Sequence, residues 1–126
     1  MKKGELGRRG EELAARYLCD AGYEIKARNY RSGHLETDII CEDGEHTVFA
    51  EVKTRTPLSL KYGRPAAAVD VKKRKNLVLC AEAYIREMRE RGENIKGPRI
   101  DIIEVYIDGD RVNIKHIKNA VLDERE

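Results

Sequence analysis

Cysteine is scarce in this chain, and its spacing matches no known framework. The three cysteines, Cys19, Cys41 and Cys80, are odd in number and far apart, and no Cys-x-x-Cys pair occurs. This spacing excludes a zinc knuckle and a disulfide-stapled fold, and free thiols are typical of proteins in a reducing cytosol. A cytoplasmic location is therefore expected.

Long apolar runs are also missing. No run approaches the length of a transmembrane helix, and the start Met1-Lys2-Lys3 is not followed by the apolar stretch of a signal peptide. We therefore expect no membrane partner. The 126 residues contain no internal repeat, so we expect one domain over residues 1–120 and a short charged tail over residues 121–126.

Signatures of several common enzyme classes are absent too. The chain has no glycine-rich phosphate turn, which argues against a simple Rossmann fold. It has no Gly-x-Ser-x-Gly elbow of a serine hydrolase. The histidines His34, His46 and His116 are isolated, so no paired ligands indicate zinc.

The hydrophobic periodicity that is present predicts an α/β fold. Apolar positions recur at helical spacing in two segments and alternate in five or six others. Between the third strand and the second helix we expect a polar, basic loop of about ten residues. The order predicts a mixed sheet with helices packed on it. The expected helices are 4–21 and 70–91, with Asp70 as N-cap, and the expected strands are 23–30, 35–41, 47–54, 66–69, 100–107 and 111–117.

Charge is unevenly distributed although the net charge is only +2. Residues 36–51 carry six acidic side chains and no Lys or Arg, whereas residues 53–75 carry eight basic side chains and one acidic one. An acidic cluster beside a basic segment is typical of a metal site that faces a polyanion. Two solvated surfaces of opposite charge explain the same pattern.

The acidic segment contains the most informative motif of the chain. Side chains two apart on a strand share a face, so Glu36 and Asp38 point the same way on one strand, and Glu51 and Lys53 do so on the next. An Asp-Gly turn signal lies between the two strands. The resulting hairpin puts Asp38 opposite or diagonal to Glu51, within about 5–8 Å.

Carboxylates and a lysine on one patch of sheet suit metal-dependent phosphodiester cleavage. Asp38 and Glu51 offer the oxygen ligands that Mg²⁺ or Mn²⁺ prefers, and the Val52 carbonyl is a further candidate ligand. Lys53 is placed to orient the nucleophile or to offset negative charge in the transition state. The alternative is a salt-bridge ladder on a charged strand.

Two further charged residues lie on apolar helix faces. Glu11 falls within the apolar arc of the first helix, and Lys73 continues the buried stripe of the second. A rim position that reaches solvent explains Glu11, and a side chain that runs along apolar surface explains Lys73. An inward position with a functional role explains Lys73 equally well, whereas position alone slightly favours the rim position for Glu11.

The chain resembles the YraN-like family. This family is similar to the PD-(D/E)xK nuclease superfamily, which has a restriction-endonuclease-like three-layer core, and to archaeal Holliday-junction resolvases. The matching motifs span nearly the whole chain: Gly7-x-x-Gly10-Glu11-x-x-Ala14-x-x-Tyr17-Leu18, Asn29-Tyr30-Arg31, Glu36-x-Asp38-Ile39-Ile40, Phe49-Ala50-Glu51-Val52-Lys53-x-Arg55, Gly63-x-Pro65, Ala68-Val69 with Lys73, and Arg99-x-Asp101-Ile102-Ile103.

The resemblance implies a single endonuclease-like domain and a set of roles. It maps metal-binding carboxylates onto Asp38, Glu51 and Glu11, and the catalytic lysine onto Lys53. It implies a Mg²⁺- or Mn²⁺-dependent endonuclease that acts on DNA rather than RNA, and selectivity for branched substrates is compatible with it. A homodimer is expected if both strands of a junction are cut, because two sites are then needed. The expected phosphate contacts are Arg55, Arg64, Lys72 and Lys73.

Two other functions stay open on the sequence. A non-catalytic nucleic-acid-binding module on the same fold would bind metal without turnover. A small interaction protein whose charged hairpin only makes salt bridges would show neither metal binding nor salt-dependent affinity for DNA.

Overall fold

A single five-stranded sheet forms the centre of the fold. The computed structural model describes residues 4–62 and 71–121. The elements are α1 (Glu5–Asp20), β1 (Glu24–Ser32), β2 (Leu35–Glu42), β3 (Thr47–Arg55), α2 (Pro57–Tyr62), α3 (Val71–Glu90), β4 (Pro98–Asp108) and β5 (Arg111–Ile117). The strand order is β1-β2-β3-β4-β5. Only the β3–β4 pair is parallel among these neighbours, which makes the sheet mixed.

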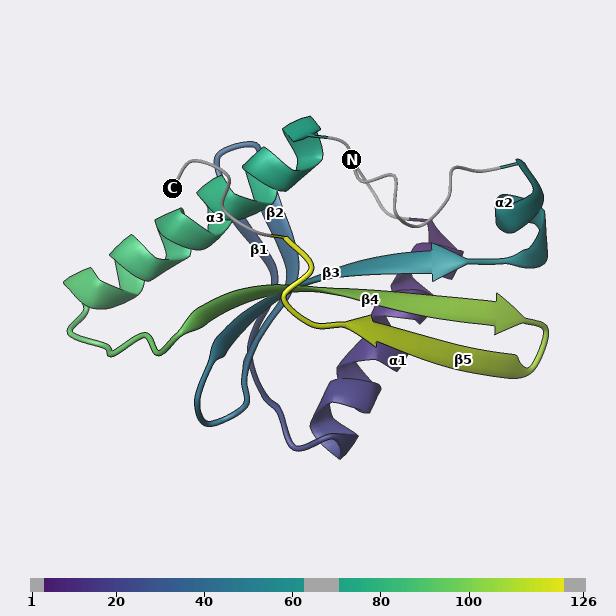
Figure 1. Ribbon diagram of the computed structural model, residues 1–126, viewed down its shortest axis with the longest axis horizontal. Coiled ribbons are helices and arrows are strands. Elements are labelled where there is room, and N and C mark those ends of the chain that lie inside the picture. The colour runs from purple at the N-terminus through teal and green to yellow at the C-terminus, as the bar shows by residue number, and fades with distance from the viewer. Residues whose placement is uncertain (1–3, 63–70, 122–126) are drawn as a thin grey trace.

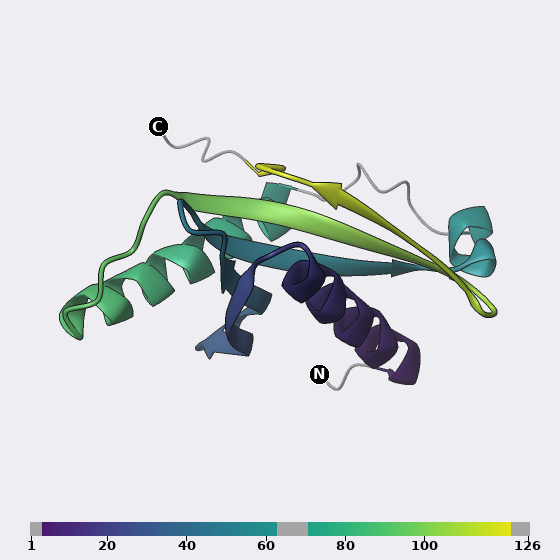
Figure 2. The same cartoon turned by 90° about the horizontal axis from the view of Figure 1, so that it is seen from below.

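The sheet is covered by one long helix on each face (Figures 1 and 2). α1 packs on one side through a cluster that includes Leu18, Val48 and Ile103. α3 packs on the other through a cluster that includes Phe49 and Ile102. The predicted α/β fold with a mixed sheet flanked by helices is confirmed. The predicted stripe of α3 is buried as expected: Leu77, Ala81, Tyr84 and Met88.

The segment after β3 differs from the prediction. Part of the expected loop is a short helix, α2, and its start explains why. The Thr56 N–H donates to Ser59 Oγ at 2.8 Å, and the Ser59 N–H donates to Thr56 Oγ1 at 3.1 Å. Pro57 at the first helical position needs no N–H partner. This reciprocal cap was a readable helix signal that the sequence analysis missed.

Several other boundaries also differ. β1 continues through Arg31 and Ser32, two residues beyond the expected strand 23–30. Val121, expected in the tail, is buried against the α3 side of the core. The expected strand 66–69, the Asp70 cap and the rest of the tail lie outside the described residues. Among the helices of the described part of the chain, none is long and apolar enough to cross a membrane.

A glycine lets α1 approach the sheet closely. A Cβ built at Gly10 would collide with Oγ1 of Thr54 on β3, and it would also lie 3.1 Å from the Thr54 Cβ. The backbone of α1 therefore touches the far end of β3 at this point. Glu11, the next residue, is buried at the same end of the strand.

We predict that Gly10→Ala destabilises the fold although alanine favours helix. Alanine in a helix interior is preferred over glycine by about 1 kcal/mol, but the clash with Thr54 should outweigh that gain and lower the free energy of unfolding by about 1–3 kcal/mol. Urea denaturation of the purified variant measures this change.

The control is the same substitution in a Thr54→Ala background, which opens the space that the new methyl group needs. There Gly10→Ala should be neutral or stabilising. Equal destabilisation in both backgrounds would show that the contact with Thr54 is not the reason for glycine.

Candidate functional site

Two acidic side chains meet where β2 and β3 separate. The register pairs Ile39 with Ala50, so the next positions along, Asp38 and Glu51, lie opposite each other. Both are nearly inaccessible, with 5 % and 4 % of their surface exposed. Asp38 Oδ2 accepts a hydrogen bond of 2.8 Å from the Val52 N–H, which fixes its orientation across the gap between the strands.

Proximity and burial change the acidity of this pair. Burial raises the pKa of Glu51, and the hydrogen bond and negative charge of Asp38 raise it further. The positive charge of Lys73 opposes these effects, and the pKa comes to about 7. Two adjacent carboxylates of this kind share a proton near neutral pH unless a cation compensates both charges.

Two lysines provide positive charge beside the pair. Lys73 Nζ lies 2.9 Å from Glu51 Oε2, and Lys53 Nζ lies 3.5 Å from the same oxygen. Partial burial lowers the pKa of Lys73, but Glu51, Asp38 and Glu36 outweigh this effect and raise it. Lys73 on α3 thus reaches the carboxylates themselves, whereas the sequence suggested a phosphate contact.

The remaining predicted site residues differ in how far they are exposed to solvent. Glu11 is buried on α1, beside the Thr54 end of β3, and its role as a metal ligand stays a prediction. Lys72 is exposed at the start of α3. Arg55 is half-buried at the end of β3, with Nε 3.7 Å from Glu104 Oε2. Arg64 lies outside the described residues.

Glu104 is a buried charge that the sequence analysis missed. It pairs with Lys53 in the parallel β3–β4 register, so it faces the same side of the sheet as Lys53. Its surface is completely buried. The signal was readable: Glu104 interrupts the apolar run that begins at Ile102, on the face that also carries Ile102.

A divalent cation fits this donor set in part. Across residues 4–62 and 71–121, no group of three or more His, Cys or acidic side chains is arranged to hold a metal ion. The fit depends instead on Asp38 and Glu51, whose contacting carboxylates repel each other when both are charged. Hard oxygen donors of this kind suit Mg²⁺ or Mn²⁺.

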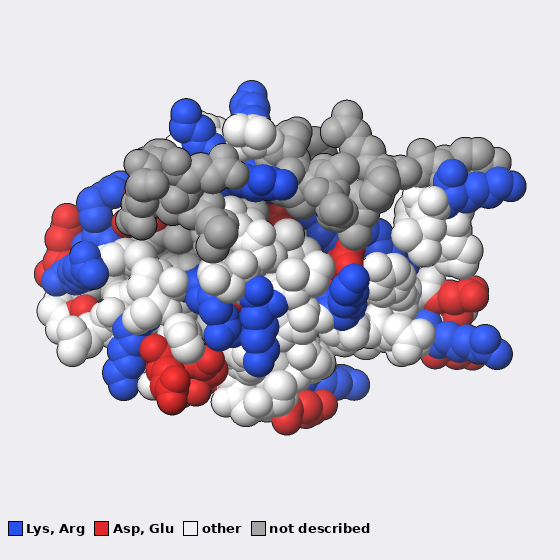
Figure 3. Space-filling view, viewed as in Figure 1, with Lys and Arg blue, Asp and Glu red and all other residues white. Residues whose placement is uncertain are grey.

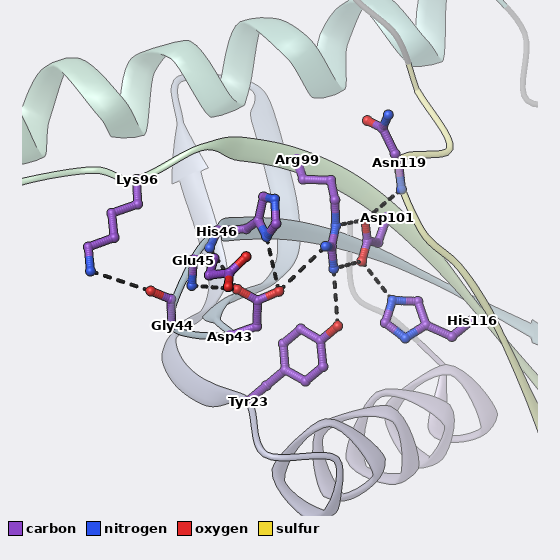
Figure 4. A network of polar contacts seen from close by, with 10 residues as sticks. All are labelled: Tyr23, Asp43, Gly44, Glu45, His46, Lys96, Arg99, Asp101, His116 and Asn119. Atoms are coloured by element: carbon purple, nitrogen blue, oxygen red, sulfur yellow. Dashed lines mark hydrogen bonds and ion pairs between the residues drawn. The ribbon is translucent and has the colours of Figure 1, made fainter.

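A second buried polar cluster lies on the opposite face of the sheet (Figure 4). Its centre is Asp101 on β4, which is fully buried and accepts two hydrogen bonds of 2.9 Å from the Arg99 guanidinium. His116 Nε2 lies 2.6 Å from Asp101 Oδ2, and His116 Nδ1 lies 2.9 Å from the Tyr17 hydroxyl of α1. A carboxylate only accepts, so Nε2 carries a proton, and the second hydrogen bond joins Nδ1 to the Tyr17 hydroxyl.

This second cluster joins α1, β4 and β5 into one unit. Burial alone would raise the pKa of Asp101, but His116, Arg99 and the Asn119 backbone N–H outweigh burial and lower it. Every polar group at the centre has a partner with good geometry. Such a saturated network is typical of a structural element rather than of a site that awaits a ligand.

We predict that Asp101→Asn destabilises the protein strongly. The substitution leaves the buried Arg99 charge without its bidentate partner, and the free energy of unfolding should fall by about 3–5 kcal/mol. Thermal and urea denaturation measure the loss. Asp20→Asn, at an exposed end of α1, is the matched control and should change little; an equally small effect of Asp101→Asn would contradict the structural role.

The raised pKa of Glu51 predicts how stability depends on pH. A carboxyl that is more basic in the folded state, with a pKa of about 7 against an ordinary 4.5, contributes stability at low pH. That contribution is lost as pH rises through this interval. In chelator-treated protein, the free energy of unfolding should therefore fall as the pH rises from about 5 to about 8.

Glu51→Gln is the control for this prediction, because an amide retains the shape and does not titrate. Its free energy of unfolding should depend less on pH than that of the wild type over the same interval. Parallel curves for the two proteins would show that Glu51 does not titrate abnormally.

Comparison with solved structures finds a resemblance at the level of chain layout. The chain is similar to a structure described as "Archaeoglobus fulgidus Hjc, a Holliday junction resolvase from an archaeal hyperthermophile". The identity is 16 % and the TM-score 0.46, over 95 % of this chain and 78 % of that one. A likeness of this degree does not define the activity of the present chain.

Comparison with sequences gives a firmer result. A UPF0102 protein of Rhodococcus opacus is 41 % identical over 116 residues, which cover 91 % of this chain and 94 % of that protein. One from Caldicellulosiruptor saccharolyticus is 42 % identical over 123 residues, or 98 % and 93 % of the two chains. The profile described as "Uncharacterised protein family UPF0102" matches residues 10–105. The chain therefore belongs to the UPF0102 family, which confirms the predicted resemblance to the YraN-like proteins.

Proposed function

We propose that this protein is a divalent-metal-dependent endonuclease that hydrolyses phosphodiester bonds in DNA. The observation that carries the proposal is the contact between the Asp38 and Glu51 carboxylates beside the Lys53 and Lys73 ammonium groups. Burying two contacting carboxylates is unfavourable, and hydrophobic residues of similar volume would stabilise the fold at least as well. Strongly perturbed acids of this kind are concentrated at catalytic sites.

The proposed cofactor is Mg²⁺ or Mn²⁺. Asp38 and Glu51 would hold it, with the Val52 carbonyl as a further ligand. Glu11 on α1 would complete the set, although in the described residues the three carboxylates do not form one ligand group. When bound, such a cation stabilises negative charge on the phosphate oxygens and lowers the pKa of a water molecule. Because Glu51 must lose its proton to act as a ligand, metal affinity should rise with pH around 7.

The side chains around the carboxylates have separate tasks in this proposal. Lys53 extends from the rigid strand that also carries Glu51, so its ammonium group is directed at the same patch, where it orients the attacking water and offsets charge on the phosphate. Lys73 stays protonated near neutral pH because its pKa is raised. Lys72, Arg55 and Arg64 would contact the flanking phosphates.

The family and the architecture support a nuclease-like protein more generally. The mixed sheet with one long helix on each face is compatible with the restriction-endonuclease-like core that the YraN resemblance implies. We extend the proposal to branched DNA and to a role in repair or recombination. Cutting both strands of a junction would then require a homodimer, because the described part of each chain contains one such site.

A second candidate function is a non-catalytic nucleic-acid-binding module. It is favoured by one observation: within the described residues only two carboxylates meet, and lysines already compensate them. In that case the Glu51–Lys73 ion pair would close the site permanently. The two candidates differ in turnover and not in affinity for nucleic acid.

We predict that Asp38→Asn abolishes cleavage and retains binding. The amide removes one metal-binding charge, so cleavage of labelled single-stranded, duplex or four-way-junction DNA in Mn²⁺ should fall by about 100-fold or more. Affinity measured by fluorescence anisotropy should change little or rise, because a negative charge near the phosphates is lost.

Lys53→Ala should also lose cleavage, whereas Asp20→Asn should cut like the wild type. Reactions with EDTA give the background. Metal-dependent cutting that survives Asp38→Asn undiminished would refute the assignment of the site. Binding without any cutting by the wild type would favour the non-catalytic module.

A further inference from the structure

A cavity lies at the end of β3 that extends beyond the two long helices. It has a volume of about 290 Å³, opens to the surface, and is lined by α2 and by the ends of β3, β4 and β5. Figure 1 shows this end of the molecule at the right, where α2 and the β4–β5 hairpin project beyond β1 and β2. The lining includes Arg55, Thr56, Leu60, Tyr106, Arg111 and Asn113.

The cavity lies on the same strand and face as the carboxylate site. Arg55 follows Lys53 by two residues and Glu51 by four, so the three side chains point to one side of β3. At the rise of a strand, Arg55 lies about 13 Å from Glu51 along the chain. A nucleic-acid strand whose phosphate is bound at Asp38 and Glu51 would therefore reach the cavity with a neighbouring nucleotide.

The Arg55 side chain has unused donor capacity in this cavity. Its Nε is buried and has no hydrogen-bond partner among the described residues, and the same is true of Glu104 Oε2. The two atoms are 3.7 Å apart, which is an ion pair but too long for a hydrogen bond. Glu104 thus holds the guanidinium electrostatically at its buried Nε, and the two terminal nitrogens of Arg55, which lines the cavity, are the donors left for a phosphate.

Glu104 also holds the aromatic wall of the cavity. The Tyr106 hydroxyl donates to Glu104 Oε1 at 3.2 Å, and the ring is half-exposed in the cavity lining. A tyrosine ring held from one edge offers its face for stacking on a base. Asn113 pairs with Tyr106 across the β4–β5 ladder and adds an amide that donates and accepts.

The charge of this end also suits a nucleotide. Arg55 and Arg111 line the cavity against one acidic residue, Asp108. Arg111 is exposed at the start of β5, and Lys61 is exposed at the end of α2. In Figure 3 basic side chains lie over α2, and basic and acidic side chains lie together at the hairpin tip, on the right of the view.

We propose that this cavity is a subsite for the nucleotide next to the scissile phosphate, with its phosphate on Arg55 and Arg111 and its base stacked on Tyr106. The inference rests on the proposed function of the carboxylate site, and it adds a binding pocket that the site residues do not include. Glu104 is the positioning residue, since it contacts both the arginine and the tyrosine.

The test measures binding with two kinds of strand. Asp38→Asn protein, which should not cut, is titrated with a short fluorescein-labelled oligodeoxynucleotide and with an abasic strand of the same length, which keeps the phosphates and lacks the bases. Arg111→Gln should weaken the binding of both strands about fivefold or more, and the affinity should depend less on salt concentration. Tyr106→Leu should weaken the binding of the base-containing strand about tenfold and should change the binding of the abasic strand little.

Matched variants separate this effect from general loss of charge or fold. Arg91→Gln removes an exposed arginine that directly follows α3 and should leave the affinity within about twofold. Tyr106→Phe keeps the ring and should bind the base-containing strand better than Tyr106→Leu. Circular dichroism and thermal melting establish that each variant is folded. If Tyr106→Leu does not fold, the affinity of Arg111→Gln compared with that of Arg91→Gln tests the subsite.

The outcomes distinguish the two proposals. If the wild type cuts DNA while Arg111→Gln and Tyr106→Leu bind like Arg91→Gln, the subsite is refuted and the nuclease stands. If Tyr106→Leu weakens the binding of both strands equally, no base stacks on Tyr106 and the inference fails. If the wild type neither binds nor cuts any DNA, both proposals fail together.

Discussion

The alternation of side chains along β3 is the constraint on which the rest of the structure depends. This strand is central in the sheet, and a long helix covers each of its faces. Val48 and Ala50 pack towards α1, while Phe49 packs towards α3 and Glu51 and Lys53 follow it on that face. One strand therefore contributes to the core on both sides and still presents charged groups at its far end.

The same alternation separates two polar clusters of different character. On the α1 side, Asp101 is surrounded by donors from Arg99, His116 and the backbone, and its negative charge is fully compensated. On the α3 side, Asp38 and Glu51 face each other, and burial together with the contact with Asp38 raises the pKa of Glu51. The first arrangement is typical of structural networks, and the second is typical of sites that bind a cation.

The far end of β3 connects the carboxylates with the cavity under α2. Parallel pairing with β4 brings Glu104 beside Lys53, although the two residues are far apart in the sequence. Glu104 in turn contacts Arg55 and Tyr106, which line the cavity. A continuous row of charged and polar groups thus extends from Asp38 to the β4–β5 hairpin on one face of the sheet.

Local signals in the sequence were sufficient for the helices, the strands and the Asp38–Glu51 hairpin. Alternation, helical periodicity and an Asp-Gly turn each involve only a few neighbouring residues, so they can be recognised in the sequence. These signals predicted Asp38 opposite or diagonal to Glu51, and the motifs identified the family. The cap of α2 is also a local signal, since Thr56 and Ser59 are three residues apart, and the sequence analysis missed it.

Tertiary structure alone decided which charges meet. The salt link from Lys73 to Glu51 requires α3 to cross the sheet, and the pairing of Glu104 with Lys53 requires the parallel register of β3 and β4. The sequence by itself determined the elements, their faces and the acidic pair, because these follow from neighbouring residues. The depth of Glu11, the ion pairs and the cavity depend on contacts between distant segments, whose geometry is set only when the helices pack on the sheet.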